Sequence, residues 1–239
     1  MGKVVDNVYT NLRYERKFVY TNQLVDDIIE QEVLSNSFCF REIYHRRSVN
    51  NLYLDDPEKS FYRQNVAGDD KRLKYRLRWY SDDFNTIKNP TLEIKKKFGA
   101  VGDKDSFKLK KFNFDLETSS VEEFQKAAEN ELLLNGEKGV HANLLNLQPA
   151  LFNSYERRYF LSDCERYRIT IDYNMAFYNP YFGNFKRSQE NLSDVVLELK
   201  YAISDDKESR QLTQNLQARL SKHSKYVRGM DLINHLLHV

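Results

Sequence analysis

Residues 73 to 80, LKYRLRWY, place a cation at every second position, namely Lys74, Arg76 and Arg78. Successive side chains of a β-strand point to opposite faces of a sheet. These three cations would therefore share one face, and the large apolar side chains between them would share the other. Like charges on one strand face repel each other, so such a face needs a neutralising partner.

The same alternation recurs in other strand-like segments, and several of them add a carboxylate to the charged face. Polar side chains two positions apart share a face in RYERKF (Glu15, Lys17), TLEIKKKF (Glu93, Lys95), SFKLKKF (Lys108, Lys110), YERRYF (Tyr155, Arg157) and VVLELKY (Glu198, Lys200), and RYRITIDY puts Arg168, Thr170 and Asp172 on one face. For any single strand, a polar face that meets water explains the pattern equally well.

Two features of the whole set favour an interior face over a solvated one. The faces are mainly Arg and Lys with a few Glu, and the opposite faces carry groups such as Phe107 and Tyr201 that helices must cover. An interior lined with charges is costly unless a charged ligand neutralises it. Because cations predominate, the ligand should be a polyanion such as a chain of phosphates. The glutamates would hold a divalent metal that bridges phosphate oxygens.

The elements that position these residues indicate an α+β protein. Apolar spacing predicts helices near 22–35, 120–135, 205–221 and 230–238, and Ser120 with Glu123 forms a capping-box pattern. We expect eight strands that form a closed antiparallel β-barrel with helices packed outside, as a single domain over residues 1–239. The strand-like segments are 13–18, 50–56, 73–80, 91–98, 106–114, 155–160, 166–173 and 195–201.

The overall composition excludes several classes of protein. With 37 basic and 35 acidic residues, the net charge is only +2, so no non-specific nucleic-acid binding is expected. Cys39 and Cys164 lie far apart, which argues against a disulfide framework or a zinc site. We find no signal peptide and no apolar run of about 20 residues, and we expect a cytoplasmic chain without a membrane segment.

Taken in order, these segments resemble a known family. RYERKF resembles the ExExK strand of the triphosphate tunnel metalloenzymes, and KYRLRWY, LEIKKK, SYERRYF, RITID, LELKY and SKYVRGM follow in that superfamily's order. The VTC branch, the polyphosphate polymerase domain, matches best, over roughly residues 10 to 231. Arg13 replaces the first glutamate of ExExK, which favours this branch over triphosphatases that use those glutamates to hold metal.

The resemblance implies roles for individual residues and for a cofactor. The implied cofactor is Mn²⁺ or Mg²⁺, and Lys110 is the least certain match because Lys108 and Lys111 lie beside it. The implied catalytic residues are Arg76, Arg78, Lys95, Arg157 and Arg168; the substrate-binding residues are Lys17, Lys110, Tyr155, Lys200, Ser224 and Lys225; the metal ligands are Glu198, Glu15 and Glu93.

The implied activity is transfer of the terminal phosphoryl group of ATP to a growing inorganic polyphosphate chain, with release of ADP. Phosphoryl transfer needs alignment and charge stabilisation more than a protein nucleophile, and no nucleophile stands out in the sequence. The implied partners are ATP and polyphosphate, and export of the product would need a membrane partner. Two alternatives remain open: a metal-dependent inorganic or nucleoside triphosphatase, and a non-catalytic polyphosphate-binding module.

Overall fold

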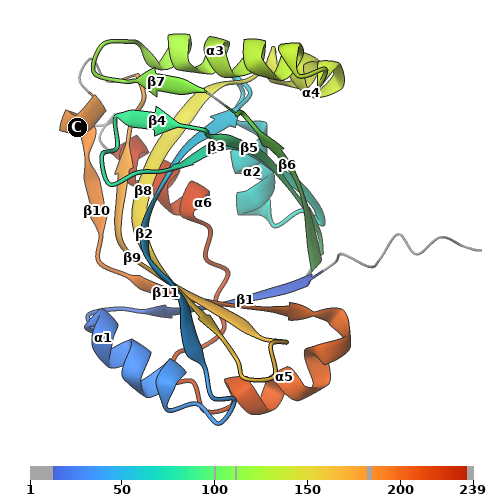
Figure 1. The fold of residues 1–239 in the computed structure, drawn as a ribbon, viewed down its shortest axis with the longest axis vertical. Coiled ribbons are helices and arrows are strands. Elements are labelled where there is room, and N and C mark those ends of the chain that lie inside the picture. The colour runs from blue at the N-terminus through green and yellow to red at the C-terminus, as the bar shows by residue number, and fades with distance from the viewer. Residues whose placement is uncertain (1–12, 100, 111, 182–184, 236–239) are drawn as a thin grey trace, which may run out of the picture.

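The computed structural model describes residues 13–99, 101–110, 112–181 and 185–235 (Figure 1). Within these residues, eight strands close into an antiparallel barrel, which confirms the predicted fold class. Around the barrel they follow the order β1 (Arg13–Tyr20), β6 (Val101–Lys108), β5 (Thr91–Phe98), β3 (Lys71–Tyr80), β2 (Arg41–Asp55), β8 (Gln148–Leu161), β9 (Arg168–Tyr178) and β11 (Val195–Ala202).

Smaller elements complete the fold. A short strand, β10 (Glu190–Leu192), extends the sheet beside β9, and β4 (Thr86–Lys88) pairs with β7 (Asn113–Asp115). The helices are α1 (Val25–Ile28), the π-helical η1 (Ile29–Leu34), α2 (Ser60–Ala67), α3 (Val121–Leu134), α4 (Lys138–Leu144), η2 (Phe185–Ser188), η3 (Ile203–Asp205), α5 (Asp206–Thr213) and α6 (Lys225–His235). In the part of the chain that the structure describes, no helix has both the length and the apolar character that a membrane span requires.

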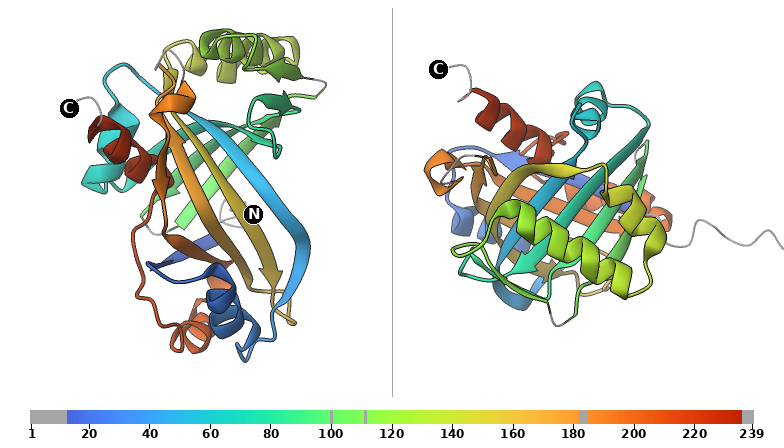
Figure 2. Two further views of the ribbon diagram at one scale, coloured as in Figure 1. Left: turned by 90° about the vertical axis from the view of Figure 1, so that its left-hand side faces the viewer. Right: turned by 90° about the horizontal axis from the view of Figure 1, so that it is seen from above.

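Two hydrophobic clusters cover the outer face of the barrel. On one side α3 covers the barrel (Figure 2), and its Phe124 packs edge to face against Trp79 in a cluster that also buries Leu77. The predicted capping box begins this helix: Glu123 N donates to Ser120 Oγ, and Ser120 N donates to the Glu123 carboxylate. On the other side α1, η1 and α5 cover β1, β9 and β11 (Figure 1). The apolar face of LKYRLRWY therefore points outward, and its cations point inward.

A third cluster lies at one end of the barrel, where α6 packs. Tyr226 and Met230 of α6 contact Tyr53 and Tyr155, which alternate onto the inner face of β2 and β8. A Cβ atom at Gly229 would lie 2.4 Å from the Phe177 ring, so only glycine allows this close approach. Both views in Figure 2 place α6 beside α2 at this end. Helix α6 thus covers one end of the barrel, whereas α1, α3 and α5 pack on its outer face.

Several predicted boundaries are wrong, and each error has a tertiary cause. The helix expected near 205–221 ends at Thr213, because the following chain pairs with β1: Leu220 bridges Phe18, and Ser221 N donates to Lys17 O. The last helix begins at Lys225 and not at 230.

The fifth strand of the sequence prediction, 106–114, lies instead at Val101–Lys108. Strands β5 and β6 form an antiparallel hairpin. Gly99, with φ of 57°, lies at its turn. Strand β6 then runs along the whole of β5, which no local pattern of its charged, glycine-containing sequence indicates.

Candidate active site inside the barrel

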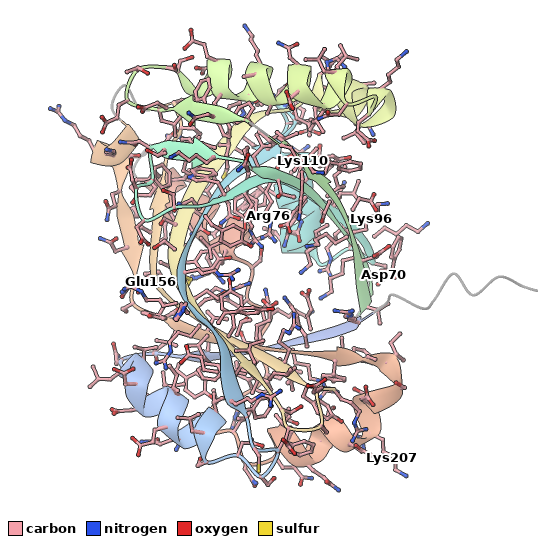
Figure 3. The ribbon with its side chains drawn as sticks, viewed as in Figure 1. Asp70, Arg76, Lys96, Lys110, Glu156 and Lys207 are labelled. Atoms are coloured by element: carbon pink, nitrogen blue, oxygen red, sulfur yellow. The ribbon has the colours of Figure 1, made fainter. Side chains whose placement is uncertain are left out.

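The charged side chains of the alternating strands meet on the inner face of the barrel. Arg76 points into the ring of strands in Figure 3. Lys96 lies outside the ring, because it follows Lys95 on β5 and so points to the opposite face of that strand. Three carboxylate-centred clusters organise most of these cations, and Lys74 lies outside them.

The first cluster surrounds Glu93 of β5. The Arg76 guanidinium lies 2.6 Å from Glu93 Oε2, Arg78 lies 3.3 Å from the same oxygen, and Lys104 Nζ lies 2.7 Å from Oε1. Burial by itself would raise the pKa of Glu93, but the three cations outweigh it and hold the pKa far below its usual value. Arg78 is further fixed by Asn51 Oδ1 at 2.9 Å.

The second cluster surrounds Asp172 of β9, which is fully buried. Arg157 binds this carboxylate through two nitrogens at 2.5 and 2.6 Å, and Lys225 Nζ donates to Oδ2 at 2.5 Å. Burial opposes the charge of Asp172, yet Arg157 and Lys225 lower its pKa below the ordinary range. Tyr155 connects this cluster to the first: its ring lies 5.2 Å from Arg157 Cζ, and its hydroxyl accepts from Arg78 at 3.2 Å.

The third cluster joins Glu15 of β1 to Glu198 of β11. Lys95 pairs with Glu15, Lys200 lies 2.6 Å from Glu198, and Lys17 lies 3.6 Å from Glu198. Burial and the neighbouring Glu198 would raise the pKa of Glu15, but the surrounding lysines lower it to about 2. The pKa of Glu198 is also lowered, because its lysine neighbours outweigh burial.

These two carboxylates are the part of the site that fits a divalent cation. Glu15 and Glu198 are ionised, belong to neighbouring strands and lie near enough to influence each other's pKa. Two carboxylates, completed by phosphate oxygens and water, are a usual set for Mg²⁺. Glu93 fits less well because three cations already occupy its oxygens. Across the described residues, no group of three His, Cys, Asp or Glu side chains forms a metal centre.

Among the described residues, Lys74 lies on the inner face but pairs with none of these carboxylates. Lys74 Nζ donates to Ser224 Oγ at 2.9 Å, and Ser224 Oγ also accepts from Val227 N at 3.3 Å at the start of α6. Lys74 belongs to the cation stripe of LKYRLRWY, but the family motifs assign it no role. Lys225 is the first residue of α6, and Ser224 directly precedes it.

Two predicted site residues do not join these clusters. Arg168 is an exposed residue at the first position of β9, opposite Lys200. Lys110 is exposed in the turn after β6 (Figure 3), and the lysine that β6 contributes to the inner face is Lys104. The sequence analysis did not predict the strand pairing that brings Lys104 opposite Lys95, because its predicted strand began at residue 106. The one available signal was the charged segment GDKDSFK. The predicted roles of all these residues remain predictions.

A surface pocket of about 770 Å³ outside the barrel offers a weaker candidate. It lies along residues 42–47 of β2, beside Arg158 and Tyr173. Its charges are largely compensated, since Arg158 pairs with Glu42 at 2.8 Å and Arg46 with Glu156 at 2.8 Å. The barrel interior is therefore a better candidate than this pocket for binding an anionic ligand.

Comparisons with known proteins agree with the order of motifs in the sequence. A family model described as the VTC domain matches residues 12–234. A comparison with curated protein sequences finds no match.

Solved structures with a similar arrangement are distant in sequence. The PH1819 protein from Pyrococcus horikoshii OT3 is 13% identical, with 93% of this chain and 98% of that chain covered and a TM-score of 0.48. The capping enzyme triphosphatase of Mimivirus is 11% identical, with 89% and 93% covered and a TM-score of 0.39. Likenesses at this level assign no activity.

Proposed function

Because the chain belongs to the VTC domain family, we propose that it transfers the terminal phosphoryl group of ATP to an inorganic polyphosphate chain and releases ADP. The observation that carries this proposal is the excess of cations over carboxylates on the inner face of the barrel. The cations are Lys17, Lys74, Arg76, Arg78, Lys95, Lys104, Arg157, Lys200 and Lys225, and the carboxylates are Glu15, Glu93, Asp172 and Glu198.

A linear polyphosphate suits this arrangement better than a compact anion. The cations come from several strands around the barrel and from α6, so successive phosphates can receive donors from more than one side. Arg76 and Arg78 are held side by side by Glu93, with their guanidinium groups directed inward. A planar guanidinium donates to two phosphate oxygens at once, which fixes the orientation of the group as well as its charge.

In the proposed reaction, an oxygen of the terminal phosphate of the chain attacks the γ-phosphorus of ATP. The new P–O bond forms as the bond between the γ-phosphorus and the β–γ bridging oxygen breaks, and ADP carries away the electron pair. The attacking oxygen is already ionised, so no side chain needs to remove a proton. Arg76, Arg78 and the Tyr155 hydroxyl would orient the transferring group and stabilise its charge. A divalent cation held by Glu198 and Glu15 would neutralise phosphate oxygens.

Incubation of the purified protein with ATP and Mn²⁺, followed by a polyphosphate gel and an ADP assay, tests the proposal. A ladder of polymer with an equivalent amount of ADP is the expected result. Free phosphate without polymer would replace the proposal by a triphosphatase, in which water is the attacking group. No turnover, with added tripolyphosphate stabilising the fold, would leave a binding module.

The metal assignment has its own test. We expect Glu198→Gln to lose the dependence of activity on Mn²⁺ concentration, because it removes one carboxylate of the only adjacent pair on β1 and β11 within the described residues. Glu156→Gln is the matched control, since Glu156 lies outside the barrel and pairs with Arg46 (Figure 3). An unchanged Mn²⁺ titration in Glu198→Gln would remove Glu198 from the metal site.

A further inference from the structure

Lys74 has no carboxylate partner among the described residues, unlike Arg76, Lys95 and Lys225. Arg76 has Glu93, Lys95 has Glu15 and Lys225 has Asp172, whereas Lys74 has the neutral hydroxyl of Ser224 at 2.9 Å. The side chain is half-buried, so water only partly replaces the missing anion.

The groups that face Lys74 from each neighbouring element are mostly positive. Lys95 lies directly opposite on β5, Lys17 approaches from β1, and Arg72 and Arg76 flank it on its own strand. Before α6, the carbonyl of His223 accepts from Lys17 Nζ at 2.8 Å and holds that charge in place.

The carboxylate nearest along β2 is already fully used. Asp55 follows the last residue of β2 that pairs with β3. Its oxygens accept from the backbone nitrogens of Phe61 and Tyr62 at 3.0 and 2.9 Å and from the Tyr226 hydroxyl at 2.5 Å. It therefore holds α2 and α6 to the barrel and offers Lys74 no free oxygen.

Burial, followed by the charges of Lys17, Lys95, Arg72 and Arg76, holds the pKa of Lys74 well below the ordinary lysine value. A phosphate chain brings negative charge to the same place and reverses the balance. The charged form of the amine then becomes the favoured one, since it can donate charge-assisted hydrogen bonds to phosphate oxygens.

We propose that Lys74 takes up a proton from the solvent when a phosphate chain binds beside Ser224, so that anion binding to this barrel is coupled to proton uptake. A buffer acid gives up the proton, and the lone pair of Lys74 Nζ forms the new N–H bond. The inference rests on the phosphate-binding part of the proposed function and not on the transfer reaction. Because the bound form holds the extra proton, affinity falls as the pH rises.

Calorimetric titration of the full chain with inorganic tripolyphosphate tests this coupling. Titrations in buffers of different ionisation enthalpy give the number of protons taken up for each tripolyphosphate bound. We expect wild type to take up about one proton more than Lys74→Arg, whose guanidinium stays charged throughout. The matched control is Lys96→Arg, since Lys96 pairs with Asp105 outside the barrel, and it should equal wild type. Equal uptake in wild type and Lys74→Arg would overturn the inference, and so would an absence of tripolyphosphate binding.

A second measurement reads the amine of Lys74 itself. In wild type with ¹³C-labelled lysine, the ε-methylene resonance that is missing from Lys74→Arg should titrate well below the ordinary lysine range and return toward it with tripolyphosphate. Titration of that resonance in the ordinary range would overturn the inference. Lys74→Met, which removes the amine, should weaken tripolyphosphate binding about 10- to 100-fold.

The two proposals can fail separately. Proton uptake that depends on Lys74, together with an absence of polymer from ATP, would overturn the transferase and keep this coupling. A polymer ladder with proton uptake unchanged in Lys74→Arg would do the reverse.

Discussion

Two neighbouring regions inside the barrel handle positive charge in opposite ways. In the Asp172 cluster (Asp172, Arg157, Lys225), a fully buried carboxylate receives three donor nitrogens within 2.6 Å. In the Lys74 cluster (Lys74, Ser224, Lys17, Lys95), the central amine donates to a hydroxyl, has no carboxylate partner in the described part of the chain and faces further cations. The clusters meet where Ser224 precedes Lys225 at the start of α6.

The difference separates cations that a carboxylate holds in the fold from a cation that, in our proposal, a ligand completes. Arg157 and Lys225 were assigned to phosphate binding by their motifs, yet the Asp172 carboxylate neutralises one of their two charges and fixes both side chains. A buried pair that loses one partner leaves an uncompensated charge, which is strongly destabilising. Lys74 is uncompensated from the outset, so a bound anion should improve its environment most.

Among the variants that test this difference, Asp172→Asn should have the largest effect on stability. It leaves Arg157 and Lys225 buried without a counter-charge, and we expect the free energy of unfolding to fall by about 3–5 kcal/mol. Urea denaturation without added anions measures the change. Asp105→Asn is the control, because the exposed Lys96–Asp105 pair should contribute no more than about 1 kcal/mol. A loss below 1 kcal/mol in Asp172→Asn would show that the cluster is not a structural anchor.

Arg76→Ala should separate ligand binding from stability. We expect the rate of polyphosphate synthesis to fall about 100-fold, because a donor to the transferring group is lost. The unfolding free energy should change little, since Glu93 keeps Arg78 and Lys104. Lys96→Ala, outside the barrel on the next strand, should leave both quantities unchanged. Full activity in Arg76→Ala would contradict the assignment of the inner face to phosphate.

Acid should weaken the Asp172 cluster in a defined pH window. The pKa of Asp172 is lowered in the folded chain, so its stabilisation is present above the unfolded pKa of about 4 and is lost as the pH falls further. For this one group the loss from pH 5 to pH 3 should be about 1 kcal/mol. Wild type should lose that much more than Asp172→Asn over the same interval, measured by urea denaturation. Parallel curves would mean that the carboxylate pKa is not lowered.

The smallest expected effect has the opposite sign. Lys74→Met should raise the unfolding free energy by about 1 kcal/mol at neutral pH without anions, because it removes a half-buried amine from a group of cations. Saturating tripolyphosphate should abolish this advantage, since only wild type gains the new contact. Thermal unfolding with and without tripolyphosphate measures both. A loss of stability in the variant without anions would place Lys74 with the structural cations.

The fold and much of the candidate site were accessible from sequence for a local reason. The two-residue period of a strand assigned Lys74, Arg76 and Arg78 to one face, and the structure confirms that this face is the inner one. The capping box at Ser120 fixed the start of α3 correctly, because it needs only residues three positions apart. The order of motifs, including SYERRYF and LELKY, identified the family.

The errors lie where a distant segment decides the outcome. Lys104 belongs to the site because β6 pairs with β5 from Val101 onward, and Lys110 falls beyond its end. The last helix starts at Lys225 because the chain before it first pairs with β1 at Phe18.

The sequence by itself determined which side chains share a strand face, because that depends only on backbone alternation. Only the tertiary structure decided which charges neutralise each other, because barrel closure and strand register bring together residues far apart in the chain. Asp172 meets Lys225 across 53 residues, and Lys74 meets Ser224 across 150. The sequence predicted a charged face for phosphate, and the fold paired Arg76, Lys95 and Lys225 of that interior with carboxylates while it placed Lys74 against the hydroxyl of Ser224.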